Sequence, residues 1–217
     1  MLKKIVFWGA TGHAKVLREF MERIGYTLVA LFDNNRQVSP PFPDTPLYYG
    51  EEGFKRWQKV QMNEEIACLV AIGGSRGRDR LEIQKYLELH HIMPTIGIHP
   101  RAFVAADAHI SKGSQILANA TVCTEVRIGE ACIVNTGSII EHETILGNGV
   151  HVAPGATLAG CVSIGDFTMI GAGAIILPHI KIGGDVIVGP GSVVTKDIPD
   201  GKVVSGNPAR IRKDNIQ

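Results

Sequence analysis

An aliphatic side chain recurs at every sixth position of the C-terminal half of the chain. The series has sixteen members, all Val, Ile or Leu: Val104, Ile110, Ile116, Val122, Ile128, Val134, Ile140, Leu146, Val152, Leu158, Ile164, Ile170, Ile176, Ile182, Val188 and Val194. Four residues after each member stands a small or branched residue that is never charged, as at Ala120, Val126 and Cys132. One short strand and one corner occupy six residues, so three hexads close a triangular coil with the aliphatic side chains inside. The pattern therefore predicts a parallel β-helix of a little over five coils.

The residue directly after the aliphatic position marks the predicted corners. It is glycine at Gly129, Gly147, Gly165, Gly171, Gly183 and Gly189, and asparagine at Asn135. Gly and Asn tolerate backbone angles that other residues avoid. We therefore expect these residues to supply the unusual angles of the corners.

Residues 1–100 lack the six-residue period and alternate strands with helices. Apolar runs predict strands over residues 5–8, 27–32, 67–72 and 95–98. A stripe of Ala14, Leu17, Met21 and Ile24, ended by Gly25, predicts a helix, and a second helix is expected over residues 78–90. Four prolines between residues 39 and 46 predict a loop. Alternating strands and helices indicate a parallel sheet, so we expect a Rossmann-like α/β domain over residues 1–100 and a β-helix with a C-terminal cap over 101–217.

Composition and charge exclude several classes of function. A hydrophobic content of 45% with 25 glycines and only 6% aromatic residues describes a folded chain of small and branched aliphatics. Lys+Arg total 22 and Asp+Glu total 21, a net charge of +1, which lacks the basic excess expected for nucleic-acid binding. The first apolar run, residues 5–8, is too short for a signal peptide or a membrane span, so we expect no membrane partner and a cytoplasmic protein.

The four cysteines show no pattern of a zinc site or a disulfide framework. Cys68, Cys123, Cys132 and Cys161 form no CxxC or Cys/His spacing. We interpret them as reduced, packed thiols.

Two glycine loops carry candidate phosphate chemistry. The first runs from Gly9 to Lys15 and includes Thr11, Gly12 and His13. A glycine turn that opens a helix presents free N–H groups to a phosphate, and an acid about 20 residues later can accept from a ribose, which points to Asp33 with Asn34. The alternative is a tight turn between packed elements.

A second glycine loop follows the third predicted strand. It contains Gly74 and leads into Arg76, Arg78 and Arg80. In a parallel sheet both loops lie on the same edge, an arrangement that favours a diphosphate, although arginines on a helix are more often a solvated face.

His142 is the candidate base of the β-helix. It occupies an outward-facing hexad position, and Gly160 takes the same position one coil later. An imidazole beside bare backbone suits acyl transfer, because the histidine can take a proton and an exposed N–H can stabilise an oxyanion. The alternative is an ordinary surface histidine.

Three motifs together resemble one branch of the hexapeptide-repeat acetyltransferases. They are residues 9–15 (GATGHAK), residues 135–143 with Glu141, His142 and Glu143, and residues 205–210 (SGNPAR). That branch contains the nucleotide-sugar N-acetyltransferases of bacillosamine and perosamine synthesis and the sialic acid O-acetyltransferases, and the similarity spans the chain. The resemblance implies a left-handed β-helix, a homotrimer with acetyl-CoA between neighbouring β-helices, a nucleotide sugar on the N-terminal domain, and no metal.

The resemblance also assigns roles to individual residues. It makes His142 the general base, Glu143 its hydrogen-bond partner and Asn135 a nearby amide. The residues that it implies beside acetyl-CoA are His151, Gly160, Ala172, Gly189, Asn207 and Pro208; those for the nucleotide sugar are Gly9, Thr11, Gly12, His13, Lys15, Asp33, Asn34, Gly74 and Arg78. Neighbours on a strand point to opposite faces, so Glu143 or Glu141 reaches His142 only if a corner intervenes.

We therefore expect an acetyl-CoA-dependent N-acetyltransferase that acts on an amino group, at C4, of a nucleotide-linked amino-dideoxy sugar. The favoured substrate is UDP-4-amino-4,6-dideoxy-N-acetylglucosamine, with GDP and dTDP left open. One alternative is a sialic acid or other sugar O-acetyltransferase. Another is a γ-type carbonic anhydrase, whose three zinc-binding histidines have no counterpart here, since the residue 36 positions after His142 is Pro178. A scaffold without catalysis is the third.

Overall fold

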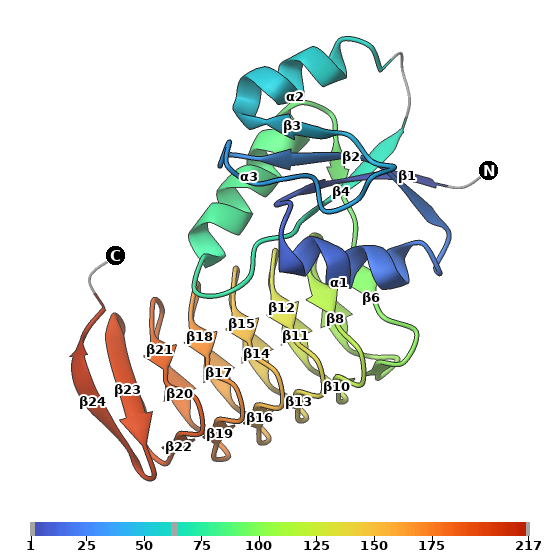
Figure 1. Cartoon of the computed structure of the whole chain (residues 1–217). Helices are drawn as coiled ribbons and strands as arrows, with labels where there is room; N and C mark the ends of the chain where they lie inside the picture. Colours follow the sequence, from blue (N-terminus) through green and yellow to red (C-terminus); the bar gives the residue numbers. More distant parts are fainter. Residues whose placement is uncertain (1–2, 62–64, 216–217) are drawn as a thin grey trace.

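The structure is a computed structural model of the chain that describes residues 3–61 and 65–215. The outermost positions of the two predicted domains, residues 1–2 and 216–217, lie outside the described residues. An α/β part packs on one face of a triangular β-helix, and an antiparallel hairpin closes the far end of the β-helix (Figure 1). No helix in the described part of the chain is long and apolar enough to cross a bilayer.

The N-terminal part is a five-stranded parallel sheet with helices on both faces. Its elements are β1 (Lys3–Trp8), α1 (Gly12–Met21), β2 (Tyr26–Asp33), β3 (Leu47–Tyr49), α2 (Gly50–Gln58), β4 (Ile66–Val70), α3 (Gly77–Leu89) and β5 (Met93–Pro94). The strand order is β3-β2-β1-β4-β5. Alternate side chains of β1 explain the two layers, because Ile5 and Phe7 join the core under α1 whereas Val6 and Trp8 join the core under α2 and α3. The predicted parallel α/β sheet is confirmed.

Three local predictions differ from the structure. β3 and α2 were not predicted, because β3 has only three residues and α2 buries only two large apolar side chains, Phe54 and Trp57. Ile24 was expected on the first helix, but α1 ends at Met21 and Ile24 is exposed. The predicted strand 95–98 is divided, since β5 ends at Pro94 and β6 (Gly97–Ile98) pairs with the β-helix strand β9.

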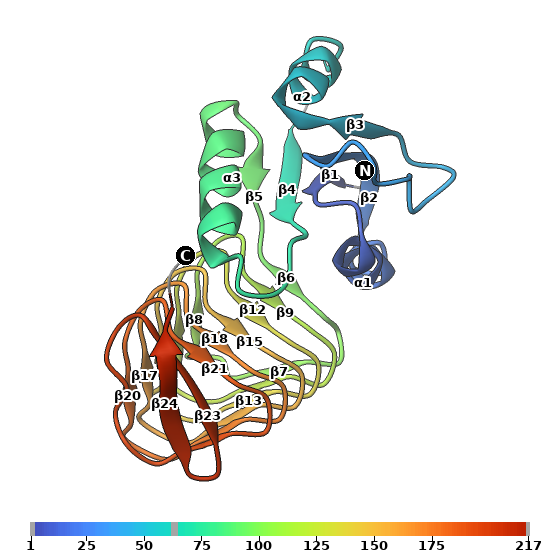
Figure 2. The ribbon, with the colours of Figure 1, turned by 60° about the vertical axis from the view of Figure 1, so that its left-hand side comes forward.

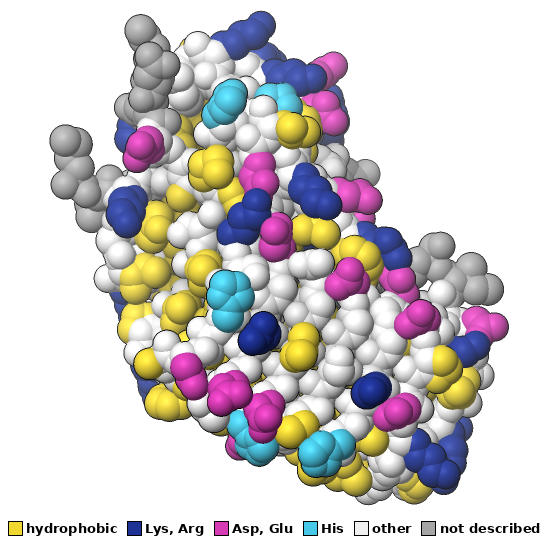
Figure 3. All heavy atoms as spheres, turned by 180° about the vertical axis from the view of Figure 1, so that it is seen from behind, with side chains coloured by type: hydrophobic (Ala, Val, Ile, Leu, Met, Phe, Trp, Pro, Cys, Tyr) yellow, Lys and Arg dark blue, Asp and Glu magenta, His cyan; other side chains and the backbone are white. Residues whose placement is uncertain are grey.

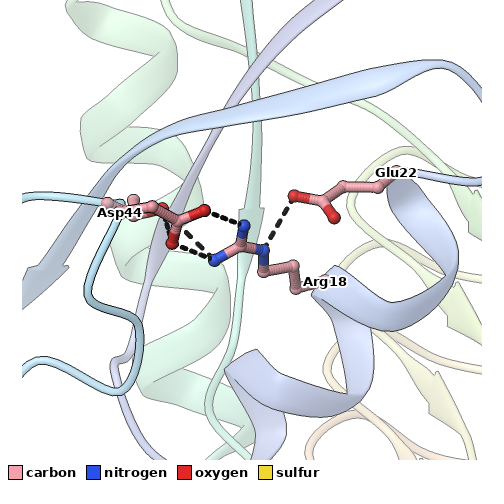
Figure 4. Close-up of polar contacts among 4 residues, drawn as sticks. Arg18, Glu22 and Asp44 are labelled. Atoms are coloured by element: carbon pink, nitrogen blue, oxygen red, sulfur yellow. Dashed lines mark hydrogen bonds and ion pairs between the residues drawn. The ribbon is translucent and has the colours of Figure 1, made fainter.

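The proline-rich segment 39–46 is a loop, as predicted, and a salt bridge fastens it to α1. Arg18 donates from Nη1 to Asp44 Oδ1 at 2.7 Å and from Nε to Glu22 Oε1 at 2.7 Å (Figure 4). The guanidinium also lies 4.4 Å from the ring centroid of Phe42. The hydrogen bond from Arg18 lowers the pKa of Asp44 to about 2. The loop is therefore held over the helix in spite of its four prolines.

The β-helix has three faces of short parallel strands. The first face consists of β6, β9 (Gln115–Ile116), β12 (Ile133–Val134), β15 (His151–Val152), β18 (Met169–Ile170) and β21 (Ile187–Val188); the second of β7 (Phe103–Val104), β10 (Thr121–Val122), β13 (Ile139–Ile140), β16 (Thr157–Leu158), β19 (Ile175–Ile176) and β22 (Val193–Val194); the third of β8 (His109–Ile110), β11 (Arg127–Ile128), β14 (Ile145–Leu146), β17 (Ser163–Ile164) and β20 (Lys181–Ile182). We call the corner from the first to the second face the first corner, the next the second corner, and the return to the first face the third corner. The triangular outline is visible along the axis (Figure 2).

The predicted aliphatic column forms the core of the β-helix. Every member from Ile116 to Val194 is buried, and Val104 and Ile110 of the first coil are partly buried. Each fully buried Val, Ile or Leu contributes roughly 1.5 to 3 kcal/mol of transfer free energy before chain entropy is subtracted. The end beyond β21 is covered by β23 (Lys202–Gly206) and β24 (Ala209–Asp214), which are antiparallel.

The glycines after the aliphatic position do not have the role that the sequence predicted. The left-handed backbone lies two residues later, three positions after the aliphatic, at Asn119, Glu125, Ala131, Gly137, Glu143, Gly149, Gly155, Cys161, Phe167, Gly173, His179, Asp185 and Gly191. The predicted glycines are instead needed for close approach between coils. A Cβ on Gly129 would lie 2.7 Å from the backbone of Gly147, and one on Gly165 would lie 2.4 Å from Gly184 N.

Candidate active site

A cavity of about 380 Å³ lies at the carboxyl ends of β1, β2 and β4. Four predicted residues line it, namely Gly9, Thr11, Asp33 and Asn34. Asp33 is held beside the glycine turn, because its carboxylate accepts the N–H of Ala10 and the N–H of Asn35, each at 2.9 Å. The glycine turn and the acid after β2 are thus brought together as expected for a loop that binds a phosphate and a ribose.

Gly9 is required at this edge by both its backbone angle and its neighbours. Its φ is +111°, and a Cβ would lie 2.4 Å from Ala71 O. The cavity also contains residues that the sequence did not single out, among them Trp8, Arg76 and Asp79. Arg76 and Asp79 form an ion pair with each other at the start of α3, so the charged groups on this side of the cavity are paired.

The other predicted nucleotide residues lie outside this cavity. Gly12 and Lys15 are exposed on the first turn of α1. His13 Nε2 hydrogen-bonds to Gln115 Oε1 of β9 at 2.6 Å, and burial lowers the pKa of His13. Arg78 forms an ion pair with Asp185 of the third corner and lies 4.3 Å from the ring centroid of Phe167. The structure therefore uses His13 and Arg78 in contacts between the two parts of the chain.

Arg80 is fully buried between the α/β part and the β-helix and bonds only to backbone carbonyls. It donates to Ala131 O at 2.9 Å and Gly149 O at 2.7 Å on the third corner, and to Ile72 O at 3.2 Å and Gly74 O at 3.4 Å on the second glycine loop. Burial lowers the pKa of Arg80 to about 10, which leaves it charged at neutral pH. A solvated helix face, the alternative drawn from the sequence, does not describe this arginine.

His151 connects the second glycine loop to the first face. Its Nδ1 donates to Gly74 O at 3.1 Å, so its Nε2 accepts from Asn135 Nδ2 at 3.1 Å. Burial, together with the charge of Arg80, lowers the pKa of His151 to about 4. The ring is neutral, buried and bonded through both nitrogens. The expected contact of His151 with acetyl-CoA stays a prediction. Its bonds to Gly74 and Asn135 were not visible in the sequence, because these residues are distant from it along the chain.

His142 and Glu143 meet at the second corner, between β13 and β14. His142 Nδ1 lies 3.0 Å from Glu143 Oε2. The corner that this contact required is present, because Glu143 has a φ of +58° and its side chain turns toward its neighbour. Hydrogen bonds from His142 and from the Cys161 thiol hold the pKa of the Glu143 carboxyl below its usual range. The Glu143 carboxylate accepts a hydrogen bond from Nδ1–H of His142, so the proton of the neutral ring lies on Nδ1 and the Nε2 lone pair is free.

Gly160 lies directly beneath the imidazole of His142. A Cβ on Gly160 would be 2.4 Å from His142 Nε2 and 2.5 Å from Cε1. Gly160 lies one coil after His142, and only a glycine at this position leaves room for the imidazole ring. The predicted pairing of His142 with bare backbone is therefore present in the fold.

The remaining predicted residues lie on other edges of the β-helix. Asn135, Ala172 and Gly189 belong to the first corner, and Asn207 and Pro208 form the exposed turn between β23 and β24. The α/β part covers the first face, where Leu117 and Ile133 join its core. Within one chain, His142 is thus separated from the cavity and from Asn135 by the body of the β-helix.

One group of metal-ligating side chains occurs among the described residues, and it is not a set of three histidines. It consists of His142, Glu143 and Cys161. The four cysteines are free, with Cys68 and Cys132 buried and Cys123 and Cys161 partly exposed.

Comparison with known proteins gives matches to both halves of the chain. The family model described as the PglD N-terminal domain matches residues 4–85, and the bacterial transferase hexapeptide model matches residues 161–196. No curated protein matches the sequence.

Several solved structures match the whole chain. A variant of perosamine N-acetyltransferase from Caulobacter crescentus, with one histidine replaced by asparagine and solved with CoA and GDP-perosamine, is 29% identical, with a TM-score of 0.90 and 99% of each chain covered. The acetyltransferase domain of PglB from Neisseria gonorrhoeae, solved with acetyl coenzyme A, is 30% identical, with a TM-score of 0.85 and coverage of 98% of this chain and 100% of that one. WeeI from Acinetobacter baumannii, at 24% identity and a TM-score of 0.80 over 97% of this chain and 100% of that chain, supports the fold alone.

Proposed function

The chain belongs to the hexapeptide-repeat sugar N-acetyltransferases, and from this premise we propose that it acetylates the C4 amino group of a UDP-linked amino-dideoxy sugar, with His142 as the general base. The predicted resemblance, the α/β domain followed by a left-handed β-helix, and the use of acetyl-CoA are confirmed at the level of the family. We propose that residues 1–100 bind the nucleotide sugar and that residues 101–217 carry out the acetyl transfer. The reaction is assigned to the cytoplasm, where acetyl-CoA is available, and needs no metal.

One observation carries the role of His142. Its Nδ1 is held by the Glu143 carboxylate at 3.0 Å, and its Nε2 lies over the bare backbone of Gly160. A base needs an unprotonated nitrogen, a fixed orientation and room for the reacting groups. The Glu143 carboxylate supplies the first two, and the missing side chain of Gly160 lets the ring take the position in which Nε2 lies over bare backbone.

The reaction follows from this arrangement. Nε2 of His142 takes a proton from the sugar ammonium, and the amine nitrogen attacks the thioester carbon of acetyl-CoA. The carbonyl oxygen takes up negative charge, for which the N–H of Gly160 is the expected donor. As the C–S bond breaks, the CoA thiolate takes the proton held by His142, which returns to its starting tautomer. The attacking nitrogen loses one of its two remaining protons to solvent, so the products are a neutral amide, free CoA and one released proton. Glu143 stabilises the imidazolium between these steps.

The cavity at the ends of β1, β2 and β4 is the proposed nucleotide site. Its glycine turn opens α1 and offers backbone N–H groups to phosphates, while Asp33 and Asn34 lie where a ribose or base would be recognised. The Caulobacter relative was solved with GDP-perosamine. Calorimetry with UDP, GDP and dTDP tests the nucleotide: the uridine assignment holds if UDP binds at least about tenfold more tightly, and GDP takes its place if the order is reversed.

We further propose a homotrimer in which each active site lies between two copies. His142 and Gly160 lie on the second corner, and Asn135, Ala172 and Gly189 on the first. A threefold arrangement of triangular prisms can set the second corner of one copy against the first corner of the next, which brings these residues to one acetyl-CoA. Within one chain, His142 lies across the β-helix from the nucleotide cavity. In the proposed trimer, a nucleotide sugar bound to one copy can instead reach the His142 of a neighbouring copy.

Replacement of the base tests the mechanism. His142→Asn is nearly isosteric, and His142 is half exposed, so the melting temperature should barely change. Loss of a general base costs roughly 10²- to 10⁴-fold in kcat, and higher pH should restore part of the rate because solvent then deprotonates the amine. A variant that keeps more than about a third of the wild-type kcat at neutral pH would remove His142 from this role.

Mixed oligomers test the shared site. If each site takes His142 from one copy and Asn135 from the next, a mixture of the inactive variants His142→Asn and Asn135→Ala should regain up to about a quarter of the wild-type activity after the copies exchange. Sedimentation should give a trimer. A monomer that still turns over acetyl-CoA, or an exchanged mixture without recovered activity, would contradict the shared site.

A further inference from the structure

The second corner brings an imidazole, a carboxylate and a thiol to one point. The candidate ligand atoms of His142, Glu143 and Cys161 all lie within 4.8 Å of one another. His142 Nδ1 is 3.0 Å from Glu143 Oε2, and Cys161 Sγ is 3.6 Å from the same oxygen. We propose that this cluster binds a Zn²⁺ ion, or another borderline-soft divalent cation, and that the bound ion inhibits the enzyme.

The β-helix itself builds the site. Cys161 follows Glu143 by 18 residues, one coil further along, and the two residues have the same left-handed backbone, with φ of +60° and +58°. A hydrogen bond from Cys161 N to His142 O at 2.9 Å keeps the two coils in register. The three side chains therefore start from rigid, stacked backbone, which limits the ordering that a metal must impose.

The ligand types and spacing match the coordination chemistry of zinc. Zinc prefers four-coordinate sites of thiolate, imidazole and carboxylate, with ligand atoms about 3.3 to 3.8 Å apart in a tetrahedron. The two distances from Glu143 Oε2, 3.0 Å to His142 Nδ1 and 3.6 Å to Cys161 Sγ, lie in or within a few tenths of an ångström of that range, and all three ligand atoms lie within 4.8 Å of one another. Three protein ligands leave the fourth position to water.

Charge around the corner also favours a cation. An open groove runs across the adjoining coils, lined by Asp107, Glu125 and Glu143, with Arg127 as its cationic member and His109 beside it. Acidic side chains gather along this edge of the β-helix (Figure 3). An acidic groove raises the local concentration of divalent cations.

Binding would inhibit through the tautomer of His142, an effect that rests on the proposed function. When Nδ1 becomes a ligand, its proton leaves, and the neutral ring carries its proton on Nε2 instead. The Cys161 thiol loses its proton to solvent, so one proton is released for each ion bound. Nε2 then has no free lone pair and cannot take a proton from the sugar ammonium, and Glu143 is held by the metal.

Cobalt and zinc titrations of the intact, reduced protein test the site. Co²⁺ should give a thiolate-to-cobalt charge-transfer band, and calorimetry should give one Zn²⁺ per chain. Cys161→Ser, a near-isosteric change, should abolish the band and weaken zinc binding by about 10²-fold or more, whereas Cys123→Ser, a partly exposed cysteine on the same corner, should change neither. Equal zinc binding by the wild type and Cys161→Ser would overturn the site.

Activity assays separate the metal site from the proposed base. Without zinc, Cys161→Ser should keep its rate within about threefold of the wild type, because the serine hydroxyl can replace the thiol as the hydrogen-bond donor to Glu143 Oε2. Zinc should inhibit the wild type reversibly, with recovery on chelation, and Cys161→Ser should resist the same concentration. Thiolate ligation without inhibition would support the metal site but refute inhibition through His142, and with it the role of His142 as the general base. Inhibition that is equal in both proteins would refute the site and leave that role untouched.

Discussion

Gly160→Ala should disable His142 without touching the imidazole itself. The three heavy atoms nearest to a Cβ at Gly160 all belong to the His142 ring, with Nε2 at 2.4 Å, Cε1 at 2.5 Å and Cδ2 at 3.1 Å. The backbone of Gly160 does not have a positive φ, so alanine fits its conformation. The added methyl group can be accommodated only if the ring moves.

The distances set the size of the effect. Ordinary van der Waals contact begins at 3.4 Å, so Nε2 must move by about 1 Å. A displacement of that size in a catalytic group costs about 10²-fold in rate. The His142 side chain is half exposed and can swing into solvent, so the free energy of unfolding should change by less than about 0.5 kcal/mol.

A double-mutant cycle isolates the cause. Steady-state kcat is measured for the wild type, Gly160→Ala, His142→Asn and the double variant, with the melting temperature of each. If alanine acts only by displacing the imidazole, Gly160→Ala should slow the wild type about 10²-fold and leave His142→Asn almost unaffected.

Two results would refute this reasoning. A Gly160→Ala enzyme with more than about a third of the wild-type kcat would show that the position of Nε2 over Gly160 is not the reactive one. A further large loss when Gly160→Ala is added to His142→Asn would show that the methyl group does not act through the imidazole alone but also blocks acetyl-CoA, which the proposed function places beside Gly160.

Three further predictions concern the α/β part and its junction with the β-helix. Arg80→Leu leaves buried carbonyls without a hydrogen-bond donor and should lower the free energy of unfolding, measured in urea, by on the order of 3 kcal/mol. The control Arg56→Leu replaces an exposed arginine and should change it by under about 0.5 kcal/mol. Similar values for the two variants would contradict the hydrogen bonds described for Arg80. The pKa of His151 falls from 6.5 to about 4 on folding, so the unfolded chain takes the proton first, and the free energy of unfolding should fall by about 3 kcal/mol between pH 6.5 and pH 4. Urea titrations at several pH values should show a shallower fall in His151→Gln, and an identical slope would reject the assignment. Asp33→Asn should raise KM for the nucleotide sugar and leave KM for acetyl-CoA nearly unchanged in steady-state kinetics, and a comparable rise in both would move the nucleotide away from the end of β2.

The β-helix could be predicted almost completely because its rule is local. One aliphatic residue in every six makes each short strand turn the same side chain inward, and every coil repeats the arrangement. The same regularity placed Gly160 beside His142, since 18 residues return the chain to the same edge. The role of the corner glycines was predicted wrongly. The six-residue period shows that glycine recurs at a position, but it does not show whether glycine is needed there for its backbone angle or for a close contact between coils.

The α/β part was less visible, because its short elements depend on neighbours. β3 has only three residues and forms by pairing with β2, and α2 forms where its two large apolar side chains, Phe54 and Trp57, pack against the sheet. The pairing of β6 with the first face likewise depends on β9, which lies 18 residues later.

The sequence by itself determined the β-helix, the parallel α/β sheet, the cavity residues Gly9 and Asp33, and the pairing of His142 with Gly160, since each follows from short-range pattern. Only the tertiary structure decided that Glu143 and not Glu141 bonds to His142, because that choice depends on the backbone angle at the corner. It also placed Arg80 and His151 between the two parts of the chain, where carbonyls from distant segments surround them. The physical reason is that sequence spacing predicts contacts along one periodic element, whereas contacts between elements depend on how their surfaces meet in space.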